Sequence, residues 1–358
     1  MEIVVNLFPG TEVGVERQQP MRHLTNMHRS KPIGIALSLL LASTALSPLA
    51  STRLERYETP GQAPVNSWWL DIADGGVIVF DTLRTITDAK AAIAKLRQRS
   101  RPVRGILITH PHPDHVTGLG TFRDAFPNVP IYSTQEADAW LKAHGRDLLK
   151  MNVQARAPGD ATDTIPPATH FVHDGEPLTL GGTRVEVMVL GDGESPAAVV
   201  YFIPDRKLLI GGDVLTPGRV PLLAAGQTRK WLNQIDRLLA TYPAATRLLP
   251  GHGPETTIGA AGNWQRGYIE RFRALAQQAI PPTSAGGGCI TKREADALLA
   301  TMHKEWPARA LVAKMPPAAL DQLNIEGVGH ELGAAPCEGR ANPVREKSRP
   351  SSQSGRIR

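Results

Sequence analysis

The sequence is poor in cysteine. Only two of its 358 residues are cysteines, Cys289 and Cys337, and neither stands in a C-x-x-C pair or beside a histidine cluster. A zinc–thiolate site is therefore not expected. In an oxidising compartment the two thiols could form a disulfide that holds the C-terminal segment, and two free thiols are the open alternative.

The sequence also lacks a nucleotide-binding glycine motif, an internal repeat and a basic patch interleaved with aromatic residues. The net charge is +6, but most of it comes from the tail after residue 338, so the body of the chain is near neutral. We therefore expect no nucleic-acid partner and predict a small-molecule substrate. The oligomeric state stays open.

The segment that begins at Met27 has the pattern of a secretory signal peptide. Basic residues precede the apolar run Ile33 to Ala42, which is too short to span a bilayer comfortably, and small residues end at Ala45 or at Ala50. We expect residues 1–50 to be a misassigned start plus this signal. The mature protein is then periplasmic or secreted, without stable membrane insertion. An uncleaved anchor and a cytoplasmic protein with a stray apolar run are the alternatives.

After residue 50, short β-branched runs alternate with helical patterns. The expected strands are 66–72, 77–80, 103–108, 131–133, 184–190, 197–203, 208–210 and 247–249. The expected helices are 88–99, 116–126, 134–149, 228–241 and 260–279. Two β-rich halves with flanking helices predict an α/β fold in which two sheets pack face to face with helices outside.

The expected organisation has three parts after the signal. Residues 51–280 form one domain, and residues 281–337 form a helical C-terminal extension that begins after a linker rich in proline and glycine. Helical patterns near 291–305 and 317–332 make up that extension. Residues 338–358 form a polar, basic tail that is expected to be disordered.

The strongest functional signal follows the strand expected at 103–108. Three histidines and one aspartate occur within six residues there, as His110, His112, Asp114 and His115. Imidazoles and carboxylates at this density are typical of a metal site. His110 and His112 stand two apart on an extended loop and can share one ion, whereas Asp114 and His115 at the next turn can serve a second.

Two later residues have the same placement after an apolar strand. Asp213 ends the run Gly211-Gly212-Asp213, and His252 lies in Pro250-Gly251-His252-Gly253. Each alone would more often be a turn residue. Together with the first cluster, both are predicted to be metal ligands.

This order and spacing, over about residues 60–270, resembles the metallo-β-lactamase superfamily. The resemblance implies a four-layer αββα sandwich with a one- or two-metal site at one edge, usually zinc. It implies that His110 and His112 hold the first metal and that Asp213 bridges the two. The second metal would be held by Asp114, His115 and His252.

One position departs from the family pattern. The family usually has a further histidine in a Gly-x-Gly-His-(Ser/Thr)-Pro loop, and this chain has Glu194 there. Glutamate can ligate zinc, and its charge favours harder ions, so Zn²⁺ is expected with Mn²⁺ or Fe²⁺ possible. The alternative is a Glu194 that does not ligate, which leaves a one-metal site. A similar loop occurs in the alkylsulfatase branch, but that branch has glutamate in place of Asp213 and larger C-terminal domains.

The resemblance implies a metal-dependent hydrolase. Its metal-bound hydroxide would cleave an ester, lactone or amide-type bond, and Asp114 would act catalytically by orienting that water or moving its proton. No Ser-His-Asp or Cys-His arrangement is evident. An alkylsulfatase-like hydrolase and a non-hydrolytic iron protein that handles oxygen or sulfur are the alternatives.

Substrate choice is expected to depend on rim loops. Candidates are Trp68, Trp69, His170, His173 and the Ala-, Pro- and Thr-rich stretch 150–173. The tryptophans are more often core residues, and the histidines are more often solvated loop residues.

Overall fold

A computed structural model describes residues 53–61, 63–154, 157–281, 288–307, 310–311 and 316–334. Internal contacts divide the chain into two units, Met1–Leu46 and Ser47–Arg358, and all described residues belong to the second. The predicted signal segment and the basic tail lie outside the described residues. Within the described ranges, no helix is both long enough and apolar enough to cross a bilayer.

The first sheet has six strands in the order β1-β2-β3-β4-β5-β6. Their bounds are β1 Leu54–Glu58, β2 Asn66–Asp71, β3 Val77–Phe80, β4 Val103–Leu107, β5 Ile131–Ser133 and β6 His170–Phe171. The first three strands pair antiparallel, whereas β3 to β6 run parallel. The carboxyl ends of the parallel strands therefore lie at one edge, where α/β sheets commonly place their sites.

The second sheet has the order β13-β12-β10-β9-β8-β7. Its strands are β7 Leu178–Leu180, β8 Thr183–Gly191, β9 Ala198–Ile203, β10 Leu208–Gly212, β12 Arg247–Pro250 and β13 Thr256–Thr257. β10 and β12 are parallel, and the other pairs are antiparallel. The chain thus leaves β10 and β12 on the same side of this sheet.

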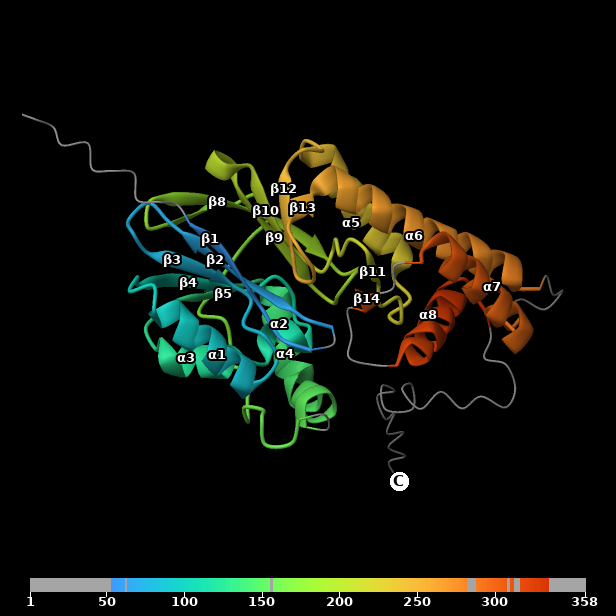
Figure 1. The fold of residues 1–358 in the computed structure, drawn as a ribbon, viewed down its shortest axis with the longest axis horizontal. Helices are drawn as coiled ribbons and strands as arrows, with labels where there is room; N and C mark the ends of the chain where they lie inside the picture. The colour runs from blue at the N-terminus through green and yellow to red at the C-terminus, as the bar shows by residue number, and fades with distance from the viewer. Residues whose placement is uncertain are drawn as a thin grey trace, which may run out of the picture. The chain divides into compact units, whose positions relative to one another are not determined.

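The two sheets pack face to face with helices outside (Figure 1). Phe80 and Leu107 of the first sheet share a buried cluster with Tyr201, Leu208 and Leu249 of the second. Helices α1 (Ile86–Arg97), α3 (Leu119–Ala125) and α4 (Gln135–Leu148) pack on the first sheet, and α5 (Thr228–Thr241) and α6 (Ile258–Ala279) pack on the second. The predicted αββα sandwich is confirmed.

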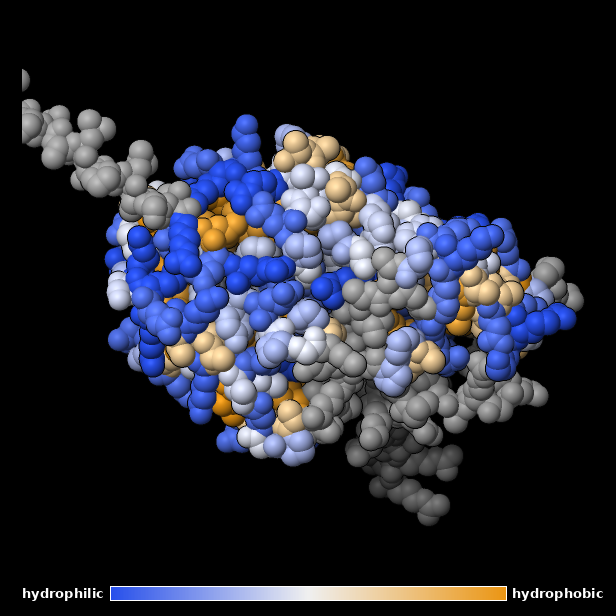
Figure 2. Space-filling view, viewed as in Figure 1, coloured by the Kyte–Doolittle hydropathy of each residue, from blue (hydrophilic) through white to orange (hydrophobic). Residues whose placement is uncertain are grey.

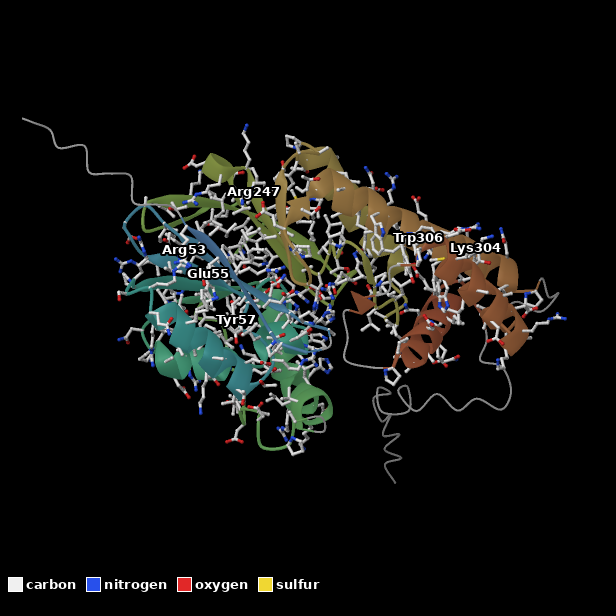
Figure 3. The ribbon with its side chains drawn as sticks, in the orientation of Figure 1. Arg53, Glu55, Tyr57, Arg247, Lys304 and Trp306 are labelled. Carbon is white, nitrogen blue, oxygen red and sulfur yellow. The ribbon has the colours of Figure 1, made fainter. Side chains whose placement is uncertain are left out.

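The elements on the outer side of the first sheet form as their sequence patterns predict. In α1, the N-cap Thr85 accepts a hydrogen bond from the backbone N–H of Asp88, and the buried residues Ala92, Ile93 and Leu96 lie on one face. At the start of the first sheet, Tyr57 (Figure 3) stacks on Trp69 with ring centroids 5.7 Å apart. Most large apolar side chains are buried in the core clusters. The face seen in Figure 2 is mainly hydrophilic, with small, separate apolar patches.

The C-terminal part adds helices α7 (Lys292–Glu305) and α8 (Pro317–Glu331), as the sequence indicated. Trp306, at the end of α7, contacts Tyr268 of α6 edge-to-face at 5.5 Å (Figure 3). The buried side chain of Asn324 accepts from the Leu223 N–H at 2.6 Å and donates to the Pro221 carbonyl at 2.9 Å. The short strand β14 (Ala310–Leu311) pairs with β11 (Arg219–Val220). These contacts fasten the extension to the segment that follows Asp213.

The helix predicted over 116–126 is present as α3 (Leu119–Ala125), but it begins later than expected and a short helix that was not predicted precedes it. The structure has α2 (Pro113–Val116) and then α3, separated at Gly118. The Gly118 N–H donates to the Leu83 carbonyl at 2.9 Å instead of to a carbonyl of α2, so the first helix ends there. A Cβ at Gly118 would lie 2.1 Å from the Thr82 carbonyl oxygen, so glycine is required at this close approach. The break places Asp114 and His115 on their own short helix.

Three further details differ from the expectation or complete it. The loop expected from residue 150 begins instead with a π-helix, Leu149–Gln154, that continues α4. β1, β6, β7, β11, β13 and β14 were not predicted. Cys289 is disulfide-bonded, and Cys337 lies outside the described residues.

Candidate metal centre

The first group of candidate ligands combines the end of β4 with the loop after β8. His110 follows β4 and is 1% exposed, and His112 is the N-cap of α2. Glu194 places Oε1 3.2 Å from His112 Nδ1 and Oε2 4.0 Å from His110 Nε2. The structure thus brings Glu194 to the place that the sequence pattern gives to the missing histidine.

Helix α5 holds the Glu194 loop with residues on one of its faces. Gln234 accepts a hydrogen bond from the Glu194 N–H at 3.2 Å and donates to the Gly191 carbonyl at 3.1 Å. One turn away on either side, Arg237 donates to the Val189 carbonyl at 2.7 Å, and Lys230 pairs with Asp192. Spacings of four and three residues place these side chains on the same face of the helix.

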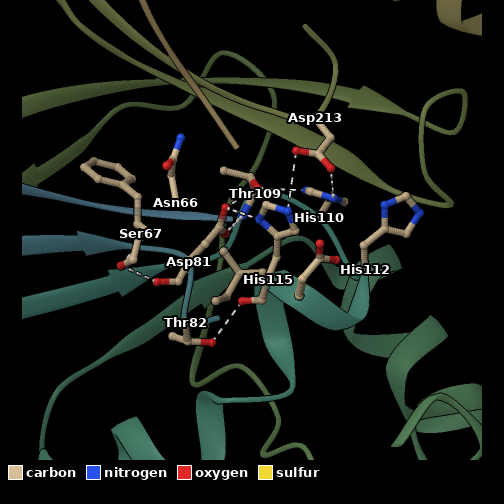
Figure 4. Close-up of polar contacts among 12 residues, drawn as sticks. Asn66, Ser67, Asp81, Thr82, Thr109, His110, His112, His115 and Asp213 are labelled. Carbon is tan, nitrogen blue, oxygen red and sulfur yellow. Dashed lines mark hydrogen bonds and ion pairs between the residues drawn. The ribbon is translucent and has the colours of Figure 1, made fainter. Parts of the chain in front are cut away.

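The second group comes from α2 and from the loop after β12. Asp114 Oδ2 lies 3.3 Å from His252 Nε2, and His115 is completely buried beside them. Asp213, which follows β10, lies between the two groups. Its Oδ1 is 3.4 Å from His115 Nε2, and its Oδ2 is 3.7 Å from His110 Nε2 (Figure 4). The same Oδ2 is 3.2 Å from His252 Nε2. All seven sequence-predicted donors therefore converge.

Asp81, at the end of β3, organises the centre and was not predicted. Its Oδ2 accepts from His115 Nδ1 at 2.8 Å and from Thr109 Oγ1 at 2.7 Å, and its Oδ1 accepts from the Thr109 N–H at 2.8 Å (Figure 4). Its backbone has φ of +59°, an unusual conformation for aspartate. Ser67 supports it by donating to the Asp81 carbonyl at 2.8 Å. In the sequence, the one indication of a role for Asp81 is that this polar residue directly follows a buried strand.

These hydrogen bonds fix the tautomers of three histidines. Nδ1 of His115 faces Asp81, and Nδ1 of His252 donates to the Pro64 carbonyl at 2.6 Å. Thr109 Oγ1 donates to Asp81 and so accepts from His110 Nδ1 at 2.9 Å. In the neutral form of each ring, Nδ1 carries the proton and Nε2 faces the other candidate ligands. Such outer partners are typical of metal-binding histidines.

The buried atoms of the cluster fit a divalent metal. Within the described part of the chain, five of them are buried without a hydrogen-bond partner: His110 Nε2, His115 Nε2, His252 Nε2, Glu194 Oε2 and Asp213 Oδ1. Buried polar atoms are rarely left unpaired. Zinc bonds of about 2.0–2.2 Å in a tetrahedron separate neighbouring ligands by roughly 3.3–3.6 Å. The separations given above span 3.2 to 4.0 Å.

The electrostatics of the cluster also fit a bound cation. Burial opposes the charged form of His252, but the carboxylates of Asp213 and Asp114 outweigh it and raise its pKa to about 9. Burial acts on His115 in the same direction, and Asp213 and Asp81 outweigh it to raise that pKa well above its usual value. Burial and two neighbouring imidazoles lower the pKa of His110. Protons on His115 and His252 thus balance the carboxylates, a role that a metal ion would take over.

A buried arginine also contacts the cluster. Arg84, on the loop after β3, is 8% exposed and places its guanidinium 3.2 Å from Asp114 Oδ2. Burial alone would raise the pKa of Asp114, but Arg84 and His252 hold it well below its usual value. Asp114 is therefore ionised and accepts hydrogen bonds only. Asp114 was predicted from the sequence, but Arg84 was not.

Strand β2 holds the loop that carries His252. Asn66 donates from Nδ2 to the Pro250 carbonyl at 2.9 Å and to the Gly253 carbonyl at 2.7 Å, and Trp68 Nε1 donates to the same Pro250 oxygen at 2.8 Å. A Cβ at Gly251 would lie 2.1 Å from Asp213 Oδ1. The glycine is required because the loop passes directly against the ligand cluster.

The rim candidates are placed as follows. Trp68 and Trp69 are 5% and 0% exposed and belong to the core. His170 and His173 are exposed, and His170 lies on the edge strand β6 beside Tyr132. The tryptophans are therefore excluded as rim residues.

The family model described as the metallo-β-lactamase superfamily matches residues 60–252, more than half of the chain. The chain belongs to the metallo-β-lactamase superfamily. Its four-layer fold and its cluster of histidines and carboxylates are those of a metal-binding member.

Individual proteins are similar to this chain in sequence or in fold. "Probable metallo-hydrolase YqgX" of Bacillus subtilis is 29% identical over 204 residues, which cover 55% of this chain and 89% of that protein. "Linear primary-alkylsulfatase" of a Pseudomonas species is 24% identical over 215 residues, 51% of this chain and 40% of that protein. A "Beta-lactamase domain protein" from Burkholderia ambifaria has the same fold, with a TM-score of 0.58 at 17% identity over 81% of this chain and 90% of that one.

Proposed function

We propose that this protein is a hydrolase with two metal ions that cleaves an ester, lactone or amide-type bond of a small molecule. The observation that carries the proposal is that seven donors converge in two groups, with Asp213 in the first group and also within 3.4 Å of His115 and His252 of the second. His110, His112 and Glu194 would hold the first ion with Asp213. The second ion would be held by Asp114, His115 and His252, again with Asp213. Zn²⁺ suits this donor set. The carboxylates of Glu194 and Asp114, each of which would hold one ion, also suit Mn²⁺ or Fe²⁺.

Bound divalent ions would supply Lewis acidity and a water that is deprotonated near neutral pH. The protein itself supplies orientation. Asp81 and Pro64 fix the imidazoles of His115 and His252, so little reorganisation is needed during the reaction. Asp114, kept ionised by Arg84, can accept the proton of the attacking water. We also propose export to the periplasm or medium, on the pattern of residues 27–50.

A sulfate-ester hydrolase is the second candidate. The observation in its favour is Glu194, which takes the histidine's place among the ligands and resembles the alkylsulfatase loop. Against it, the bridging position holds Asp213, where that branch has glutamate, and this chain matches only 40% of the alkylsulfatase's length.

A substrate panel tests the proposal. The protein would be loaded with Zn²⁺ or Mn²⁺ and offered a chromogenic ester, a lactone, a chromogenic cephalosporin and a nitrophenyl sulfate. Asp213→Ala is the matched control, because it removes the shared ligand. Turnover of an ester, lactone or lactam that is lost in Asp213→Ala supports the proposal, and turnover of the sulfate alone supports the second candidate. No metal-dependent turnover of any substrate would contradict both.

A further inference from the structure

Helix α5 contacts the backbone beside both carboxylates of the first ligand group. Gln234 accepts a hydrogen bond from the Glu194 N–H at 3.2 Å. Trp231 donates from Nε1 to the carbonyl of Val214 at 2.9 Å, directly after Asp213. The Trp231 and Gln234 side chains are buried, at 3% and 4% exposed. The position of α5 therefore determines where the backbone presents both carboxylates.

The start of α5 is capped by another element. Gln227 at its N-cap makes no side-chain cap hydrogen bond, and the first turn contains no acidic residue. The first backbone N–H groups of a helix have no partner within the helix and need an acceptor. Glu331, the last residue of α8, accepts from the N–H groups of Thr228 and Arg229, each at 3.0 Å. A carboxylate at this end of a helix also interacts favourably with the helix dipole.

Arg273 of α6 fixes the capping carboxylate. Its guanidinium lies 2.9 Å from Glu331 Oε2 and also donates to the hydroxyl of Thr228. The side chains of Arg273 and Glu331 are 15% and 16% exposed, so solvent screens this contact only in part. Burial would raise the pKa of Glu331, but the hydrogen bonds from Thr228 and Arg229 and the charge of Arg273 lower it below its usual value. The cap is therefore a charged group that joins α5, α6 and α8.

We propose that Glu331 is a positioning residue of the metal centre, and that the C-terminal extension completes this centre through α5. Trp231 stands three residues after Thr228, so loss of the cap would first unwind the turn that carries Trp231. The family model matches residues 60–252, and Glu331 lies outside that range. The inference rests on the proposed metal centre and adds a residue that orients it from a distance.

The first test is amide hydrogen exchange, followed by mass spectrometry, on the full chain made metal-free with a chelator. In Glu331→Ala, exchange at residues 228–231 should become faster by about 5- to 30-fold, the range expected for loss of a helix cap. Faster exchange should extend to residues 190–195 and 213–216, because α5 holds these two segments.

The second test is a Zn²⁺ titration of the same proteins in competition with a chromophoric chelator. Glu331→Ala should weaken binding at the first ligand group by about tenfold, as does loss of a partner that orients a ligand. Glu326→Ala is the matched control, because Glu326 also lies on α8 and accepts a hydrogen bond from Gln322 of the same helix. This control should leave both the exchange rates and the metal affinity as in the wild type.

Unchanged metal affinity in a folded Glu331→Ala, even with a lower melting temperature, would show a purely structural role and overturn the inference. Faster exchange confined to residues 228–231 would overturn it as well. If Glu331→Ala does not fold, Glu331→Gln, which keeps the size of the side chain, decides it by the same two measurements. A wild type that binds no ion would overturn the proposed function, and exchange at residues 190–195 and 213–216 would then decide the inference alone.

Discussion

Glu194 lies between two histidines of the first ligand group. One carboxylate oxygen faces His112 at 3.2 Å, and the other faces His110 at 4.0 Å and has no hydrogen-bond partner. A residue that only supported the ligands would have its oxygens satisfied by the surrounding protein. The geometry therefore favours Glu194 as a ligand over the alternative of a non-ligating residue.

Substitution of Glu194 gives the residue-scale prediction. Glu194→Ala should lose the first ion and nearly all hydrolysis, because His110 and His112 then lack a partner that orients the ion between them. Glu194→His should keep two ions and shift the preference towards Zn²⁺. Metal content and activity would be measured beside the wild type. Full metal occupancy in Glu194→Ala would show that Glu194 is not a ligand.

The sequence indicated the seven donors but not the residues behind them. His110 to His115 form a dense local run, and Asp213 and His252 each follow an apolar strand, so the signals are local. Asp81 also follows a buried strand, but a single carboxylate without a nearby histidine is not distinctive. Arg84 becomes meaningful only when the loop after β3 folds against α2, which one sequence cannot show.

At the scale of elements, one face of α5 holds the loop that carries Glu194. Gln234 is 4% exposed and bonds to both Gly191 and Glu194. Lys230, on the same face, is 54% exposed at its side chain and pairs with Asp192 in solvent. The buried contact is expected to matter more, because exposed ion pairs contribute little.

Gln234→Ala and Lys230→Ala test this difference. Gln234→Ala should weaken binding of the first ion by about 10- to 100-fold. It should also lower the free energy of unfolding by about 1–3 kcal/mol, since the Glu194 N–H and the Gly191 carbonyl lose their partner. Lys230→Ala should change either quantity little, within about 0.5 kcal/mol. Equal effects of the two substitutions in a metal titration and a denaturant melt would refute the role given to Gln234.

Helices and strands were predicted correctly where a long periodic pattern of apolar residues occurs. They were missed where contacts between distant residues determine the local structure. The helices near 88–99, 228–241 and 260–279 form because their apolar faces cover a sheet. The break between α2 and α3 arises where the Gly118 N–H donates to the Leu83 carbonyl, and β11 and β14 are two-residue strands. Neither feature leaves a periodic signal.

At the scale of the whole molecule, the C-terminal extension attaches to the segment that follows Asp213. Asn324 holds the backbone at Leu223, and β14 pairs with β11 in the segment that follows Asp213. The sequence indicated the extension's helices but not this attachment, because the pairs join residues about a hundred positions apart.

Export is the prediction at this scale that depends on sequence alone. When the full chain is produced in a Gram-negative cell, the mature protein should begin after Ala45 or Ala50. The cationic and apolar segment before these residues would direct it to the secretion machinery. Mass spectrometry of the purified protein gives the start directly. A soluble product that still contains Ile33 to Ala42 would contradict the prediction.

The central claim is that seven side chains form a centre for two metal ions, and elemental analysis of the purified protein tests it most directly. The protein, reconstituted with Zn²⁺ and freed of excess metal, should hold about two ions per chain, one for each ligand group. Metal removal should abolish hydrolysis and lower the melting temperature, because bound ions stabilise the folded state. Absence of any stoichiometric transition metal after reconstitution would contradict the claim.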